Sequence, residues 1–141
     1  MADTGINWPL SWTQEYSGTL TTGGTITDTS DAIDLDVKAS IEISIDADYS
    51  DHAKATGGLK VYILRDVNGT DYEIDPVTDS NSKPWGFEMA FSQNATIRKT
   101  FTLYGIDFSR FKIFLHWANT TSSSNVAIVT NYQKSTIPAA S

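Results

Sequence analysis

The chain has 141 residues, a formal net charge of −7 and no cysteine. Its length fits one domain with its own core, and the missing cysteines exclude disulfides, thiolate metal ligands and thiol nucleophiles. Charged residues make up 19% and hydrophobic residues 40% of the chain, which indicates an ordered domain rather than a disordered one. Because the basic residues do not cluster, we expect neither nucleic acid nor an anionic membrane as a partner.

The net charge is concentrated between Asp28 and Asp51. This stretch of 24 residues holds eight acids and a single base, Lys38, whereas acids and bases balance in the rest of the chain. Any account of the partners of this chain therefore has to explain where the acidic stretch points.

The first 15 residues show no hydrophobic period. They contain Trp8 and Trp12, with Pro9 between them, and we expect them to form an extended arm. Residues 1–10 lack the basic and apolar segments of a signal peptide, so we expect synthesis in the cytoplasm. Residues 135–141, which include Ile137 and Pro138, are small and neutral and are expected to form a C-terminal tail. The single domain is then expected over residues 16–134.

The dominant hydrophobic period between the two arms is two residues, the period of a β-strand with one buried face. The segments with this character are 37–49, 59–65, 87–91, 97–103, 111–117 and 126–132. Segment 59–65 is apolar on both sides and is expected to be central or covered on both faces. Lys99 interrupts the apolar face of its segment, which indicates an edge or rim position.

These segments predict an all-β fold of about eight or nine strands. Glycine- and asparagine-containing turns separate the strands, and no segment has the period of an amphipathic helix. The only helical candidate is one turn at 107–111. We therefore predict a two-sheet antiparallel sandwich that is either jelly-roll-like or immunoglobulin-like, since one open sheet would leave an apolar face in water.

An enzyme is not favoured by the residues available. His52 and His116 stand apart and lack further histidines at the spacing of a zinc site. No nucleophile turn of the G-x-S-x-G type is present. Paired carboxylates for glycoside hydrolysis would have to come from a small set of glutamates, namely Glu15, Glu42, Glu73 and Glu88. We predict a protein without catalytic residues, metal or cofactor.

Calcium is the main alternative for the acidic stretch, because Ca²⁺ binds several carboxylate oxygens. Four aspartates lie close together in the sequence, Asp28, Asp31, Asp34 and Asp36, but they lack the glycine-punctuated loop of a strong calcium motif. The simpler interpretation is a solvated acidic face. In that case Glu42, Asp46 and Asp48 share the exposed face of one strand and need screening from one another.

Exposed aromatic residues favour a second alternative, a carbohydrate-binding module. Aromatic rings stack on the faces of sugar rings, and the best candidates are Tyr72 and Trp85, which lie in loops or at strand ends. In most small sandwiches tryptophans belong to the core, so the competing interpretation is structural.

Several segments together resemble small virion structural proteins of tailed bacteriophages. The resemblance covers about residues 59–133, and its segments are VYILRD (61–66), GTDYE (69–73), PWGFEM (84–89), FKI (111–113) and WANTT (117–121). It implies a non-enzymatic β-sandwich located in the virion, most simply a capsid decoration or cement protein that binds major capsid subunits as a homo-oligomer on the particle. A tail or neck component is the other location that the resemblance allows.

The two arms agree with an assembly unit of this kind, because extended arms and open strand edges are common means of joining subunits. Aromatic side chains concentrate binding energy at interface centres. We therefore expect Trp8, Pro9 and Trp12, with Ile137 and Pro138 at the other end, to contact neighbouring subunits. The alternative is that the N-terminal arm packs on its own sandwich.

Overall fold

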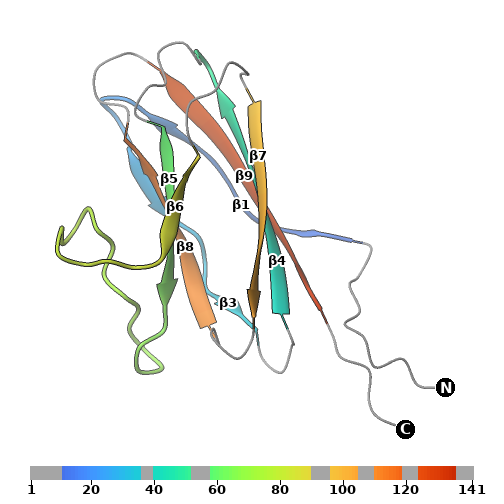
Figure 1. The fold of residues 1–141 in the computed structure, drawn as a ribbon. Helices are drawn as coiled ribbons and strands as arrows, with labels where there is room; N and C mark the ends of the chain where they lie inside the picture. Colours follow the sequence, from blue (N-terminus) through green and yellow to red (C-terminus); the bar gives the residue numbers. More distant parts are fainter. Residues whose placement is uncertain are drawn as a thin grey trace, which may run out of the picture.

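The computed structural model describes residues 11–35, 40–51, 58–89, 96–104, 110–118 and 124–135. Within these ranges the chain forms nine strands in two antiparallel sheets and contains no helix (Figure 1). The strands are β1 (Thr13–Thr21), β2 (Thr27–Thr29), β3 (Ile33–Asp34), β4 (Ser40–Tyr49), β5 (Leu59–Arg65), β6 (Gly86–Met89), β7 (Thr96–Tyr104), β8 (Arg110–Trp117) and β9 (Asn125–Lys134). The predicted all-β sandwich is confirmed.

The helical turn predicted at 107–111 is wrong for its last two residues. Arg110 and Phe111 begin β8, because the alternating pattern of that strand already starts there and Phe111 faces the core. The remainder of the predicted turn lies outside the described residues. The part of the chain that the structure describes also contains no helix that could cross a membrane.

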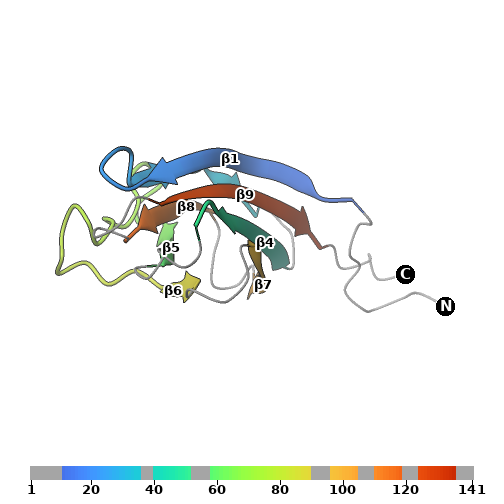
Figure 2. The same cartoon turned by 90° about the horizontal axis from the view of Figure 1, so that it is seen from above.

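The strand order identifies the sandwich as a jelly roll. One sheet has the order β1-β9-β4-β7 and the other β2-β8-β5-β6, with β3 also paired to β8. The chain changes sheet at every connection except β2 to β3 and β5 to β6. Such alternation produces the two interlocked Greek keys of a jelly roll, whereas an immunoglobulin sandwich keeps several consecutive strands in one sheet. Figure 2 shows the two layers from above.

The core lies between the inward faces of the two sheets. In β4 the predicted alternation is confirmed, because the residues from Ile41 to Tyr49 at every second position are buried. In β8 the inward set runs from Phe111 to Trp117 at the same spacing. These two central strands supply much of the buried apolar area that stabilises the fold.

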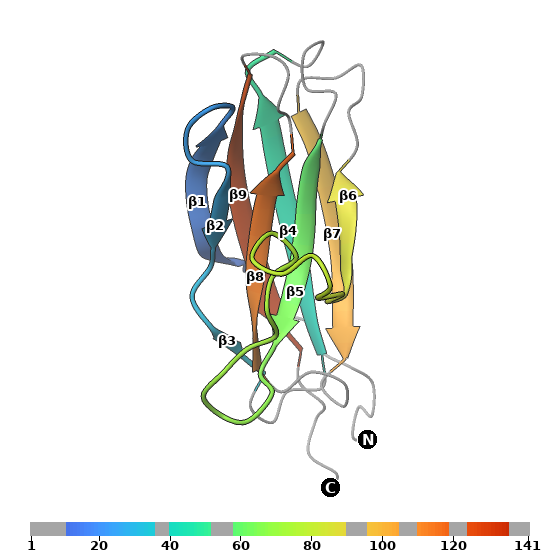
Figure 3. The same cartoon turned by 90° about the vertical axis from the view of Figure 1, so that its left-hand side faces the viewer.

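The outer face of the β2-β8-β5-β6 sheet is partly covered by the chain between β5 and β6. Leu64 and Phe114 point away from the core, yet their exposures are only 6% and 5%. Figures 1 and 3 both place the segment 66–85 on this side of the sheet. The prediction that segment 59–65 is central or covered on both faces is confirmed for the central position, since β5 lies between β8 and β6, whereas Lys60 and Tyr62 on its outer face are half-buried.

The described residues reach into both predicted arms, although only the N-terminal one contains part of a strand. β1 begins at Thr13, within the range expected for the N-terminal arm. At the other end Ser135 is buried, its amide donates to the carbonyl of Ser40 (2.9 Å), and the two hydroxyls lie 2.8 Å apart. This contact fixes the end of β9 against the start of β4.

Thr130 provides a first prediction, because its side chain is buried in the core without a partner. The residue is 0% exposed, and its Oγ1 makes no hydrogen bond with any other described group. A buried hydroxyl without a partner costs about 1–3 kcal/mol. Thr130→Val keeps the shape of the side chain and is expected to raise the free energy of unfolding by about 1 kcal/mol, measured by urea denaturation. Thr19→Val, at an exposed position of β1, is the control and should change stability little; equal effects would contradict the prediction.

Candidate functional site

A group of three aromatic rings lies at one lateral edge of the sandwich, where β6 and β7 run side by side (Figure 3). The Phe87 and Phe101 rings meet edge to face, with centroids 5.1 Å apart, and so join the two sheets. The Trp85 ring packs against both, at 5.8 Å and 5.7 Å, and is still 48% exposed. Trp85 is thus a half-exposed ring on a rigid aromatic base.

Lys99 belongs to the same edge. It lies on β7, and its Nζ is 5.0 Å from the centroid of the Phe87 ring. This geometry is that of a cation–π contact. The prediction that Lys99 marks an edge is confirmed, since β7 is the outermost strand of its sheet. We name Trp85, Phe87, Lys99 and Phe101 the aromatic edge.

A shallow depression of about 210 Å³ lies next to the aromatic edge, on the outer face of β5 and β6. Its lining residues are Lys60, Tyr62, Gly86, Phe87 and Glu88. Gly86 makes the depression possible: a Cβ at this position would lie 2.4 Å from Cδ1 of Tyr62 and 2.6 Å from the carbonyl oxygen of Val61. Tyr62 lies opposite Gly86, beside the cross-strand pair of Lys60 and Glu88, and an aromatic ring next to such polar groups can contact a small polar molecule, including a sugar.

Tyr72, the second ring predicted for ligand stacking, is not part of this depression. Its ring lies under the cations of β8, with Nζ of Lys112 at 4.6 Å and Cζ of Arg110 at 5.7 Å from its centroid. Since β8 and β6 flank β5 on opposite sides, the two predicted stacking rings do not form one platform. The sequence analysis did not identify Phe87 and Phe101 as the neighbours of Trp85.

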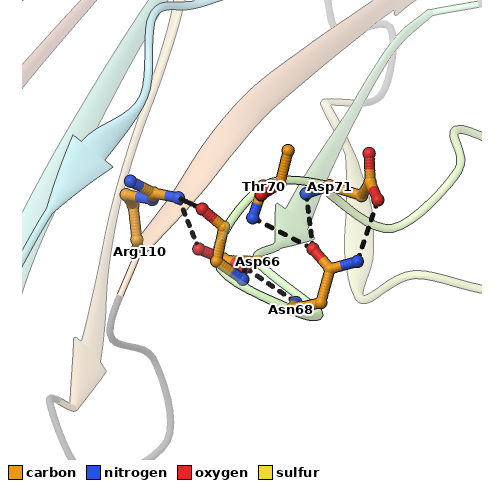
Figure 4. A network of polar contacts seen from close by, with 6 residues as sticks. Asp66, Asn68, Thr70, Asp71 and Arg110 are labelled. Carbon is orange, nitrogen blue, oxygen red and sulfur yellow. Dashed lines mark hydrogen bonds and ion pairs between the residues drawn. The ribbon is translucent and has the colours of Figure 1, made fainter.

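The turn after β5 is held by a polar network, shown in Figure 4. Asp66 Oδ1 accepts hydrogen bonds from the amides of Asn68 (3.0 Å) and Gly69 (2.6 Å), and its Oδ2 accepts one from Arg110 Nη2 (2.7 Å). The Gly69 amide and the Arg110 guanidinium are among the causes that lower the pKa of the Asp66 carboxyl. Gly69 has a φ of +86°, which glycine adopts without strain. The network satisfies the carboxylate internally, so it is structural.

The acidic face predicted for the long strand is confirmed. Glu42, Asp46 and Asp48 alternate along β4 on the outer side of the β1-β9-β4-β7 sheet. Arg98 on β7 donates to Asp46 across the strand pair (2.6 Å), and Gln133 on β9 donates to Glu42 (3.2 Å). Neighbouring strands therefore supply the screening that the like charges require.

The calcium alternative for the acidic stretch receives no support from the described residues. No group of three or more His, Asp or Glu side chains within the described ranges is arranged to hold a metal ion. Asp28 is engaged by the hydroxyl of Tyr16 (2.9 Å). Asp36, which was considered for calcium, and His52, which was considered for zinc, lie outside the described residues.

The four glutamates considered for hydrolysis lie in different parts of the fold. Glu42 and Glu88 lie on the outer faces of opposite sheets, and Glu15 lies on the edge strand β1. Glu73 is paired with Arg65 at 2.9 Å. These positions do not correspond to two carboxylates facing each other across a common groove.

Of the residues predicted at subunit interfaces, the structure describes Trp12. It precedes β1 and is 41% exposed. The other four, Trp8, Pro9, Ile137 and Pro138, lie outside the described residues.

His116 provides a prediction about pH. Burial lowers the pKa of His116, and the nearby Lys60 ammonium lowers it further, although Asp75 opposes the shift. The neutral ring is therefore favoured in the folded state, and the folded protein loses stability as the pH falls below the unfolded pKa of about 6.5. His116→Gln should reduce the loss of stability between about pH 7 and pH 5, measured by urea denaturation at each pH. Both proteins retain His52, so an unchanged pH dependence would contradict the assignment.

The fold and surface define a jelly-roll β-sandwich with an exposed aromatic edge. No protein-family model matches the chain, and no curated protein matches it. Among solved structures the chain is similar to a carbohydrate-binding module, CBM28, specific for non-crystalline cellulose, with a TM-score of 0.50, 9% identity, and coverage of 96% of this chain and 87% of the other.

Two further similarities are weaker. A protein of sacbrood virus of honeybee has a TM-score of 0.46 at 9% identity, covering 93% of this chain and 86% of the other. The CBM22-1 xylan-binding domain from Paenibacillus barcinonensis has a TM-score of 0.44 at 12% identity, covering 96% and 88%. At these identities the similarities concern the fold alone.

Proposed function

We propose that this chain is a non-enzymatic structural protein of a tailed-phage virion, which decorates the head and stabilises it by binding major capsid subunits. The observation that carries the proposal is the pair of long edge strands, β1 and β7, each paired on one side only among the described strands. Open edges of this kind join a sandwich to other subunits by strand addition. The resemblance of segments between residues 59 and 133 to phage virion proteins supports the same assignment.

The mechanism is thermodynamic. A subunit that binds the assembled lattice and not the separate capsid protein shifts the equilibrium toward the intact shell. The acidic outer face of β4 is unsuited to the centre of such an interface, because desolvating carboxylates is costly. We therefore place the contact with capsid subunits at Trp12, beside the start of β1, with the acidic face toward solvent.

The test uses Trp12 and Trp85, which are exposed to similar extents, 41% and 48%. Trp12→Ala should weaken binding of the full chain to decoration-free heads of the encoding phage about tenfold, because interface tryptophans concentrate binding energy. Trp85→Ala is the control. Binding is measured by co-sedimentation with the particles. A chain that is absent from purified virions and does not bind their heads would refute the proposal.

A second function is favoured by a specific observation, the half-exposed Trp85 beside the depression at Tyr62 and Gly86. A carbohydrate-binding module would use this surface for stacking on a sugar ring, and the fold is similar to that of a cellulose-specific module. Under this alternative Trp85→Ala abolishes binding on a glycan array while Trp12→Ala leaves it unchanged. The two substitutions thus have opposite outcomes under the two functions.

A further inference from the structure

Two strands of equal length form the lateral edges of the same sheet. β1 and β7 have nine residues each, and among the described strands β1 pairs only with β9 and β7 only with β4 (Figure 3). Each edge therefore presents a row of backbone N–H and C=O groups that no described strand pairs with, which is a template for another strand.

The directions of the two edge strands are opposite. β1, β9, β4 and β7 are antiparallel at each successive pairing, so β1 runs against β7. A second copy placed beside the first in the same orientation consequently brings its β1 antiparallel to β7 of the first. The same holds in the other sheet, where β2 runs against β6. Both sheets could then continue into the neighbouring copy without reversing any strand.

The charges of the two edges are complementary. β7 contains Arg98 and Lys99 and no acid, whereas β1 contains Glu15 and no base. Burial and the nearby Asp31 raise the pKa of Glu15, with Lys134 opposing the shift. The opposite signs of the two edges favour the contact of β7 with β1 over the contact of two like edges, since such complementarity sets the orientation of an interface.

The aromatic residues of the two edges also come into register. If β7 and β1 are aligned end to end, Phe101 faces Tyr16 of the neighbouring copy. Both rings are half-buried and face the interior side of their sheet, and cross-strand aromatic pairs stabilise a sheet. Trp85, which packs on Phe101, would be partly covered by the same contact.

We propose that copies of this chain associate side by side, with β7 of one copy paired antiparallel to β1 of the next. The contact joins two different surfaces of the molecule, so it produces a ring if the rotation closes and a filament if it does not. The contact itself is argued without the proposed function. The inference rests on that function only for the place where many copies meet, a particle that carries the chain in many copies.

The absence of cysteine permits a direct cross-linking test with the full chain. In the end-to-end register Thr100 of β7 faces Ser17 of β1, and both point to the outer side of the sheet. Thr100→Cys mixed with Ser17→Cys should give a disulfide-linked dimer on oxidation, and neither variant should do so alone. Ser44→Cys, on the central strand β4, is the control partner. Dimers of one variant alone, or none in the mixture, would overturn the inference.

Charge exchange gives a second test. Thr102→Glu should weaken self-association about threefold, because in the end-to-end register it places a carboxylate opposite Glu15 of the neighbouring copy. Adding Glu15→Lys to this variant should restore the original association, measured by sedimentation equilibrium. A chain that stays monomeric but binds phage heads overturns this inference alone, whereas a chain that self-associates but is absent from virions overturns the proposed function alone.

Discussion

Replacing Trp117 with alanine is expected to lower the free energy of unfolding by about 4 kcal/mol. Trp117 is 0% exposed and stacks on Tyr49, with ring centroids 5.6 Å apart. Its Nε1 donates to Thr22 Oγ1 (3.0 Å) and lies 3.3 Å from the carbonyl of Ser124. The substitution leaves a large cavity and removes the donor from these two acceptors. Most domains are stable by only about 5–15 kcal/mol, so the loss is severe.

The effect should extend across both sheets, because Trp117 lies on β8 and Tyr49 on β4. The Tyr49 hydroxyl donates to the carbonyl of Met89 (2.9 Å), and burial raises the pKa of Tyr49 to about 12. Chemical denaturation monitored by circular dichroism measures the change. Trp85→Ala removes the same type of side chain from a half-exposed position and should cost much less. Similar losses for both tryptophans would contradict the assignment of Trp117 to the core.

The strands were the most predictable part of this fold. The alternation from Val37 to Tyr49 specifies which side chains face inward, because a shift of one residue would expose the whole apolar set. The same argument located β8 through Phe111 and Trp117. It did not locate the start of β8 at Arg110, where one helical turn was predicted over 107–111, because five residues are too few to show a period.

Strand order was not predictable, because it depends on contacts between residues far apart in the chain. The pairing of β1 with β9 joins Leu20 to Val126, and nothing local at either position indicates the other. The alternation therefore left the jelly roll and the immunoglobulin sandwich equally open. Only the observed order of the sheets decided between them.

Of the residues at the candidate site, only Trp85 was predicted from the sequence as a residue that could contact a ligand. Trp85 was recognised from its loop position, and Lys99 from the break in an apolar pattern, but nothing linked them. Their connection runs through Phe87 and Phe101, which lie on different sheets and meet only when the sandwich forms. Tyr72 was a reasonable candidate by composition, yet Arg110 and Lys112 hold its ring elsewhere.

The strand order also shows how the acidic residues are distributed over the surface of the fold. The part of the acidic stretch that lies on β4 is screened within its own sheet by Arg98, so it does not require a partner. The part near Asp28 and Asp31 lies at the β1–β2–β3 edge, opposite the edge that carries Lys99. A uniform acidic face would keep copies apart, whereas this uneven distribution orients them.

Gly86 is the position where a single methyl group should disturb both the fold and the surface. A Cβ there would lie 2.6 Å from the carbonyl oxygen of Val61 and 2.4 Å from the Tyr62 ring. Because the first of these is backbone, the strand itself has to move. Gly86→Ala is expected to lower the free energy of unfolding by about 2 kcal/mol. Thermal and urea denaturation measure this loss.

Glu88→Ala, two residues along the same strand and exposed, is the matched control and should change stability by less than about 0.5 kcal/mol. Since β6 supports Trp85 through Phe87, displacing it should also change the fluorescence emission of Trp85, obtained as the difference between the spectra of chains with Trp85 and with Trp85→Phe. Retained stability with unchanged emission would contradict this prediction. A loss of stability together with altered emission would identify the β5–β6 pairing as the support of the aromatic edge. The proposed ligand stacking and the proposed side-by-side assembly both use that edge.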